Sequence, residues 1–99
     1  MADDWKIKRV AFTRHALNQI FTRSIGIDDV KAVISSHEIL AEYPDDFPYP
    51  SRLLLGFVKG RPLHVVLGYN SKESAAYVVT VYEPNPVLWE PGFRRRRKT

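Results

Sequence analysis

The sequence has no cysteine among its 99 residues. This absence excludes disulfide bonds, thiolate nucleophiles and cysteine-ligated zinc sites. Long apolar runs are also absent, because stretches such as Leu53-Leu54-Leu55 are far shorter than the roughly 20 residues that a membrane-spanning helix needs. Neither a glycine-rich phosphate loop nor the Gly-x-Ser-x-Gly motif of serine hydrolases occurs. We therefore expect a soluble cytoplasmic protein without a membrane partner.

Histidine is scarce, and its spacing does not favour metal binding. His15, His37 and His64 are too far apart in the chain to form a recognisable ligand motif. The acidic pair Asp45-Asp46 lies in a proline-rich segment without a neighbouring pair of histidines. The sequence therefore predicts neither a metal site nor a cofactor.

Positive charge is concentrated at the C-terminal end. Lys and Arg number 15 against 11 Asp and Glu, which gives a formal charge of +4. Five of these cations stand in residues 94–98, and without them the net charge is −1. We expect a single domain over residues 1–93 and a basic C-terminal tail over residues 94–99. The tail is a candidate to bind RNA phosphates or an acidic protein, or to remain solvated, and Trp89 and Phe93 are candidates to dock it.

The apolar pattern at the N-terminal end predicts a strand and two helices. Alternating residues before Thr13 indicate the strand, and Thr13 is a suitable N-cap for the first helix. One face of this first helix is polar, because His15, Gln19 and Arg23 form a stripe at intervals of four residues. A second, shorter helix follows Gly26. The apolar residues of the first helix recur at the spacing of one buried face: Ala16, Leu17, Ile20 and Phe21.

Four further strands complete an α+β fold. The extended segments are residues 37–43, 52–58, 63–69 and 75–82, and prolines follow the first and the last of them. The predicted order is β-α-α-β-β-β-β, with two helices packed on one face of a mainly antiparallel sheet.

The turn after residue 58 decides which side chains share a face of the sheet. With a three-residue loop, residues 59–61, Arg52, His64 and Tyr82 lie together on one face. With a two-residue loop at Lys59-Gly60, His64 lies beside Leu55 instead. We favour the three-residue loop because it gathers six apolar side chains on the other face: Leu53, Leu55, Phe57, Leu63, Val65 and Leu67.

Several short motifs then occur in a characteristic order. On these motifs the chain resembles a bacterial family of small domains of unknown function, the DUF4258 type, over residues 10–95. That family in turn resembles the RelE/ParE-like toxins of toxin–antitoxin modules. The motifs are Thr13-Arg14-His15-Ala16, Ile25-Gly26-Ile27, Arg52-Leu53-Leu54-Leu55-Gly56, Arg61-Pro62-Leu63-His64-Val65-Val66 and Thr80-Val81-Tyr82-Glu83-Pro84.

The resemblance implies a RelE-like fold and a specific activity. The protein would be the toxin of a type II module, a metal-independent endoribonuclease that cuts messenger RNA, often on the ribosome. Its partners would be RNA and a cognate antitoxin protein, for which a zinc-finger and helix-turn-helix protein is one candidate.

RNA cleavage without a metal needs a base for the 2′-hydroxyl, an acid for the leaving oxygen and a cation for the phosphorane. On this chemistry either His15 or His64 is the base or acid, Arg23 and Arg52 are phosphate clamps, and Tyr82 donates a proton or stacks on a base. The candidate RNA-binding residues are Arg14, Arg52, Arg94, Arg95, Arg96, Arg97 and Lys98.

Each of these residues also has a purely structural interpretation. His15 can bond to a neighbouring strand, Arg23 can complement a helix dipole, and His64 can pack inside the sheet. Two functions therefore stay open: a toxin-like endoribonuclease, and a non-enzymatic protein-interaction or RNA-binding module of the same fold. An enzyme needs its candidate groups within reach of one phosphate, whereas an interaction module does not.

Overall fold

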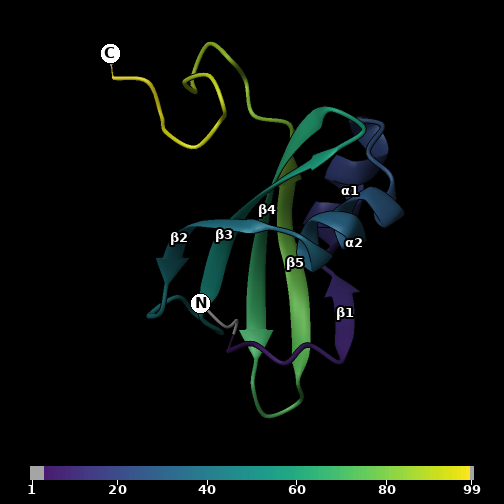
Figure 1. The fold of residues 1–99 in the computed structure, drawn as a ribbon. Coiled ribbons are helices and arrows are strands. Elements are labelled where there is room, and N and C mark those ends of the chain that lie inside the picture. Colours follow the sequence, from purple (N-terminus) through teal and green to yellow (C-terminus); the bar gives the residue numbers. More distant parts are fainter. Residues whose placement is uncertain (1–3, 99) are drawn as a thin grey trace.

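The computed structural model describes residues 4–98 and confirms the predicted order of elements. Both helices lie on one face of the sheet, to its right in Figure 1. No helix in this described part is long and apolar enough to cross a membrane. The elements are β1 (Arg9–Phe12), α1 (Arg14–Thr22), α2 (Ile27–Ser35), β2 (Glu38–Tyr43), β3 (Ser51–Val58), β4 (Arg61–Asn70) and β5 (Ala75–Tyr82).

The five strands form one mixed sheet in the order β1-β5-β4-β3-β2. The pairings of β2 with β3, β3 with β4 and β4 with β5 are antiparallel, as predicted. The pairing of β1 with β5 is parallel. The two helices form the connection between β1 and the rest of the sheet, so β1 and β2 end up at opposite edges.

A side-chain hydrogen bond caps the N-terminal end of each helix. The hydroxyl of Thr13 accepts a hydrogen bond from the amide of Ala16 at 3.1 Å, which confirms the predicted N-cap of α1. At the start of α2 the carboxylate of Asp29 accepts a hydrogen bond from the amide of Gly26, also at 3.1 Å. This contact fixes the tight turn between the two helices.

The core lies between the helices and the sheet. Ala16 and Ile20 of α1 and Val30 and Val33 of α2 are buried there. Leu17 and Phe21, which the apolar spacing placed on the same buried face, are 42% and 89% exposed, so that prediction was wrong. The reason is that α1 packs mainly on β5 and turns a narrow stripe toward it. The sheet residues of this core are Leu54, Leu63, Val65, Leu67, Ala76, Val78 and Val81, with Tyr69 beside them.

The turn between β3 and β4 is the two-residue loop Lys59-Gly60, and the predicted three-residue loop was wrong. Both residues have positive φ, 54° and 78°, which the right-handed twist of a two-residue hairpin favours. In this register Leu55 pairs with His64 and Gly56 with Leu63. The apolar pattern failed as a guide because residues 51–56 of β3 are buried whichever face they point to.

The observed register separates Arg52 from His64. Arg52 pairs with Leu67, whose side chain is in the core, so Arg52 lies on the helix side. His64 pairs with Tyr82 of β5 and lies on the opposite side, which we call the outer face. The expectation that Arg52 and His64 share a face was therefore wrong, while His64 and Tyr82 do share one. Neighbouring strands place Glu38, Leu55, His64 and Tyr82 in one row across the outer face.

Gly56 marks the closest approach of α2 to the sheet. A Cβ atom at this position would lie 2.9 Å from a methyl carbon of Val33, which is too close. We expect Gly56→Ala to lower the free energy of unfolding by about 1 to 3 kcal/mol, measured by urea denaturation. Gly68→Ala in β4 is the control, because its nearest neighbour lies at an ordinary 3.8 Å. Equal losses in the two variants would contradict the close packing of α2 on β3.

Candidate functional site

His64 lies within the outer face and is fully buried, with an exposed fraction of 0%. Its Nε2 is 2.9 Å from the carbonyl oxygen of Phe93, and its Nδ1 is 3.1 Å from the hydroxyl of Tyr82. Because a carbonyl oxygen only accepts, Nε2 carries the proton and Nδ1 accepts the hydroxyl proton of Tyr82. Burial lowers the pKa of His64 and outweighs the opposing effect of the Phe93 carbonyl, which favours the neutral ring.

Two aromatic rings pack against this imidazole. The ring of Trp89 meets it edge-on, with centroids 4.5 Å apart and planes at 87°. The ring of Tyr82 meets it at 5.2 Å and 71°. Trp89 is itself buried. His64 therefore joins β4, β5 and the C-terminal segment, residues 84–98, into one unit.

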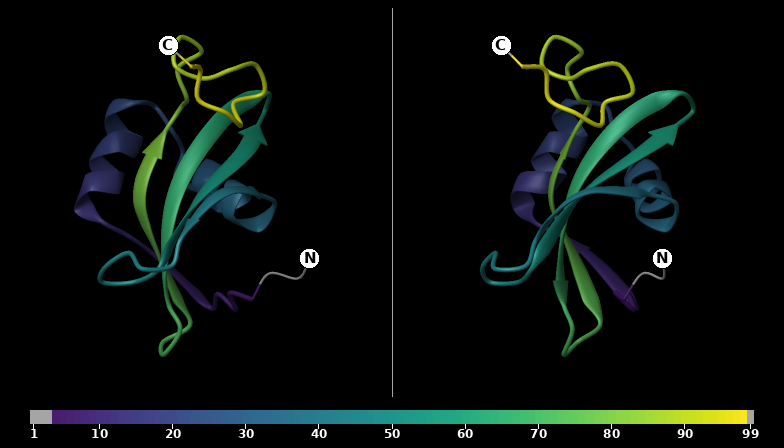
Figure 2. Two further views of the ribbon diagram at one scale, coloured as in Figure 1. Left: turned by 90° about the vertical axis from the view of Figure 1, so that its left-hand side faces the viewer. Right: turned by 60° about the vertical axis from the view of Figure 1, so that its left-hand side comes forward.

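The C-terminal segment folds back on itself over the outer face. Trp89 and Arg96 form an isolated antiparallel bridge. The amide of Glu90 donates to the carbonyl of Arg95, and the amide of Arg97 to the carbonyl of Leu88, both at 2.8 Å. The left panel of Figure 2 shows this segment across the upper end of the outer face. The predicted tail is thus held in place along residues 94–98, which we call the cationic run; Thr99 lies outside the described residues.

The side chains of the cationic run are all exposed. Arg94 pairs with Glu38 of β2 at 2.7 Å, and this carboxylate raises the pKa of the guanidinium. The Nε of Arg97 donates to the carbonyl of Pro86 at 2.9 Å. Within residues 4–98, no carboxylate forms an ion pair with the other four cations of the run. Their charge is therefore available to an anionic ligand.

Tyr82 lies between the buried histidine and the cationic run. Burial raises the pKa of its phenol, Tyr43 adds to this effect, and Arg96 opposes it. The phenol therefore stays protonated near neutral pH and acts as a hydrogen-bond donor. Its ring is half-buried, whereas Tyr43 on β2 is exposed.

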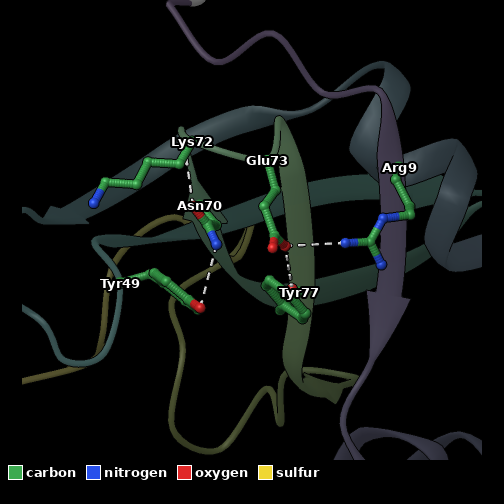
Figure 3. Close-up of polar contacts among 6 residues, drawn as sticks. All are labelled: Arg9, Tyr49, Asn70, Lys72, Glu73 and Tyr77. Carbon is green, nitrogen blue, oxygen red and sulfur yellow. Dashed lines mark hydrogen bonds and ion pairs between the residues drawn. The ribbon is translucent and has the colours of Figure 1, made fainter.

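A second aromatic group lies farther along the outer face, and Figure 3 shows the contacts that fix it. The rings of Tyr49 and Tyr77 are stacked, with centroids 5.5 Å apart and planes at 9°. The hydroxyl of Tyr77 donates to Glu73 at 3.4 Å, and Arg9 pairs with the same carboxylate at 3.2 Å. Asn70 donates to the hydroxyl of Tyr49 at 3.3 Å. Local sequence patterns did not indicate this pair, because the stacking joins a loop to a distant strand.

The remaining predicted site residues lie elsewhere. Arg14, His15 and Arg23 are exposed on or next to α1, on the far side of the sheet. Arg52 is buried on the helix side, where its Nε donates to Glu42 at 3.0 Å. Its guanidinium carbon lies 3.9 Å from the centroid of the Trp5 ring. The structure thus brings together His64, Tyr82 and the cationic run, and it separates them from the other candidates.

The contact that matters most to the site, the carbonyl of Phe93, could not be found from sequence. A backbone carbonyl carries no signature of its own, and only the fold brings it to His64. The packing of Trp89 on His64 was easier to anticipate, because Trp89 is an aromatic residue just before the charged C-terminal end. No group of three or more His, Asp or Glu side chains that could hold a metal ion occurs in the described residues.

The buried neutral histidine makes stability depend on pH. Because the pKa of His64 is lowered in the folded protein, the unfolded chain takes up a proton first as the pH falls below about 6.5. The free energy of unfolding should then decrease, by at most about 1.4 kcal/mol per pH unit for this one group. Urea denaturation at about pH 7.5 and about pH 5 should show a larger loss for the native chain than for His64→Gln. Equal losses in both chains would contradict a buried, neutral His64.

One comparison with known proteins identifies a family. The family model described as domain of unknown function (DUF4258) matches residues 12–83. The match ends before the C-terminal segment, so the cationic run is not part of it. No curated protein and no solved structure matches the chain. As its motifs predicted, the chain belongs to the family of domains of unknown function DUF4258.

Proposed function

We propose that this protein binds single-stranded RNA on the outer face of its sheet. The observation that carries the proposal is the cationic run, which is held beside Tyr82 by the contacts of His64 with Phe93 and Trp89. The run would hold the phosphates, and the tyrosines of the outer face would stack on the bases.

The distribution of charge supports an anionic polymer as the ligand. The chain without the run has a net charge of −1, so little else would attract nucleic acid. The four cations of the run that form no ion pair within the described residues would supply the sequence-independent part of RNA affinity by releasing counterions. Because the segment is already folded, less entropy is lost on binding than for a disordered tail.

The aromatic groups support single-stranded RNA in particular. Proteins recognise unpaired bases by stacking them on aromatic rings, at roughly 1 to 3 kcal/mol per base. Tyr82, Tyr43 and Tyr77 all belong to the outer face. Tyr82 and Tyr77 are five residues apart on β5, or about 16 Å, which leaves room for more than one nucleotide between them.

Cleavage of messenger RNA, as the toxin of a type II module, is a second candidate function. The hydrogen bond that Tyr82 donates to Nδ1 of His64 favours it, because the phenol oxygen can accept the 2′-hydroxyl proton of RNA while Nδ1 takes up the phenol proton, as in general base catalysis. His64 is buried and uses both ring nitrogens, so it would orient Tyr82 rather than contact RNA. A toxin of this kind would be paired with an antitoxin protein. RNA binding without cleavage requires none of the candidates that lie away from the outer face, and it is therefore our first choice. These candidates are Arg14, His15, Arg23 and Arg52.

Replacing three cations of the run that form no ion pair within the described residues should weaken RNA binding strongly. We expect Arg95→Ala, Arg96→Ala and Lys98→Ala together to reduce affinity for a labelled single strand of about 12 nucleotides by about tenfold or more. The slope of log affinity against log salt should fall by about 2, since each lost phosphate contact contributes about 0.7. Fluorescence anisotropy over a salt series measures both quantities.

The control removes the same charge from the helix side, by replacing Arg14, Arg23 and Lys31 with Ala. All three are exposed and form no ion pair within the described residues. Equal effects of the two triple variants, or no binding by the native chain, would refute the proposed surface. Denaturing gels of the same RNA separate the two functions: intact RNA supports binding alone, and cleavage that Tyr82→Phe abolishes supports the second candidate.

A further inference from the structure

The helical side of the molecule carries an apolar surface that the fold leaves uncovered. Phe21 is 89% exposed, and its neighbours Leu17 and Ile27 are 42% and 43% exposed. The spacing of Leu17 and Phe21 on α1 is that of a buried face, yet no described residue of the chain covers them. Clustered exposed apolar side chains of this kind mark interaction sites more often than isolated ones do.

This surface has both a projection and a hollow. A groove of about 590 Å³ lies where α1 ends and α2 begins, and its lining includes Leu17, Ile20, Phe21, Ile25 and Ile27. The almost fully exposed ring of Phe21 stands at its border. A patch that carries a projecting ring next to an apolar groove can pair with a copy of itself.

Opposite charges lie at the two ends of the apolar surface. Arg14 begins α1, seven residues or about 10 Å before Phe21 along the helix. Asp28 lies in the first turn of α2, directly after Ile27. Both are exposed, and neither forms an ion pair within residues 4–98. A two-fold axis near Phe21 would bring Arg14 of one copy toward Asp28 of the other.

We propose that a second copy of this chain docks on this surface and forms a symmetric dimer. The ring of Phe21 from each copy fills the groove of the other, and Arg14 pairs with Asp28 across the interface. A two-fold dimer requires a surface that is complementary to itself in shape and charge, and the ring beside a groove and the opposite charges of Arg14 and Asp28 are the features on which we base such a pairing. The outer faces stay free on opposite sides of such a dimer, so the proposal does not depend on RNA binding.

Sedimentation velocity over about 5 to 200 μM protein tests the dimer. The native chain should dimerise with rising concentration, and Phe21→Asp should stay monomeric throughout. Phe47→Asp is the matched control, because Phe47 is 91% exposed but lies in the loop between β2 and β3. It should dimerise like the native chain. Circular dichroism confirms that each variant is folded.

A charge swap tests the pairing of the two copies independently. Arg14→Asp should weaken dimerisation about tenfold, and Arg14→Asp combined with Asp28→Arg should restore it. A native chain that stays monomeric, a dimer that survives Phe21→Asp, or a double variant without restored affinity would each overturn the proposal. So would a loss of dimer in Phe47→Asp equal to that in Phe21→Asp.

Discussion

The arrangement of the site depends on one buried imidazole that is hydrogen-bonded on both sides. His64 donates to the carbonyl of Phe93 and accepts from the hydroxyl of Tyr82, while the ring of Trp89 packs against it. Ordering a chain segment costs about 1 to 2 kcal/mol per residue, so the C-terminal segment needs a specific anchor. Burial of Trp89 and these two hydrogen bonds supply it. Together with the ion pair between Arg94 and Glu38 of β2, they hold the cationic run in a fixed position on the sheet.

The registers of β4 with its two neighbouring strands determine where this anchor lies. The two-residue loop Lys59-Gly60 sets the register in which His64 pairs with Leu55, and the register of β4 with β5 pairs His64 with Tyr82. The two faces of the sheet then have separate roles. The helix side holds the core and ends in the apolar surface around Phe21. The outer face holds the tyrosines and the cationic run, which are the groups that RNA binding uses.

Much of the fold followed from local patterns in the sequence. The order of elements and the N-cap at Thr13 depend on nearby residues, and both predictions were confirmed. The hairpin register was wrong because β3 is buried on both faces, so apolar alternation did not distinguish them. The burial of Phe21 was wrong because periodicity shows which side chains share a helix face but not whether anything covers that face. The face on which Arg52 lies follows from the same hairpin register, so the residues around Arg52 alone did not reveal it.

The central claim is that His64 is neutral, protonated at Nε2 and held beneath the C-terminal segment. Long-range ¹H–¹⁵N correlation NMR of the imidazole tests it most directly, because the two nitrogens have different shifts in each tautomer. The account predicts a ring that is still mostly neutral and protonated at Nε2 at about pH 6.5, with a cross-relaxation contact to the indole of Trp89. A ring that becomes protonated near pH 6.5 and shows no contact to Trp89 would contradict it.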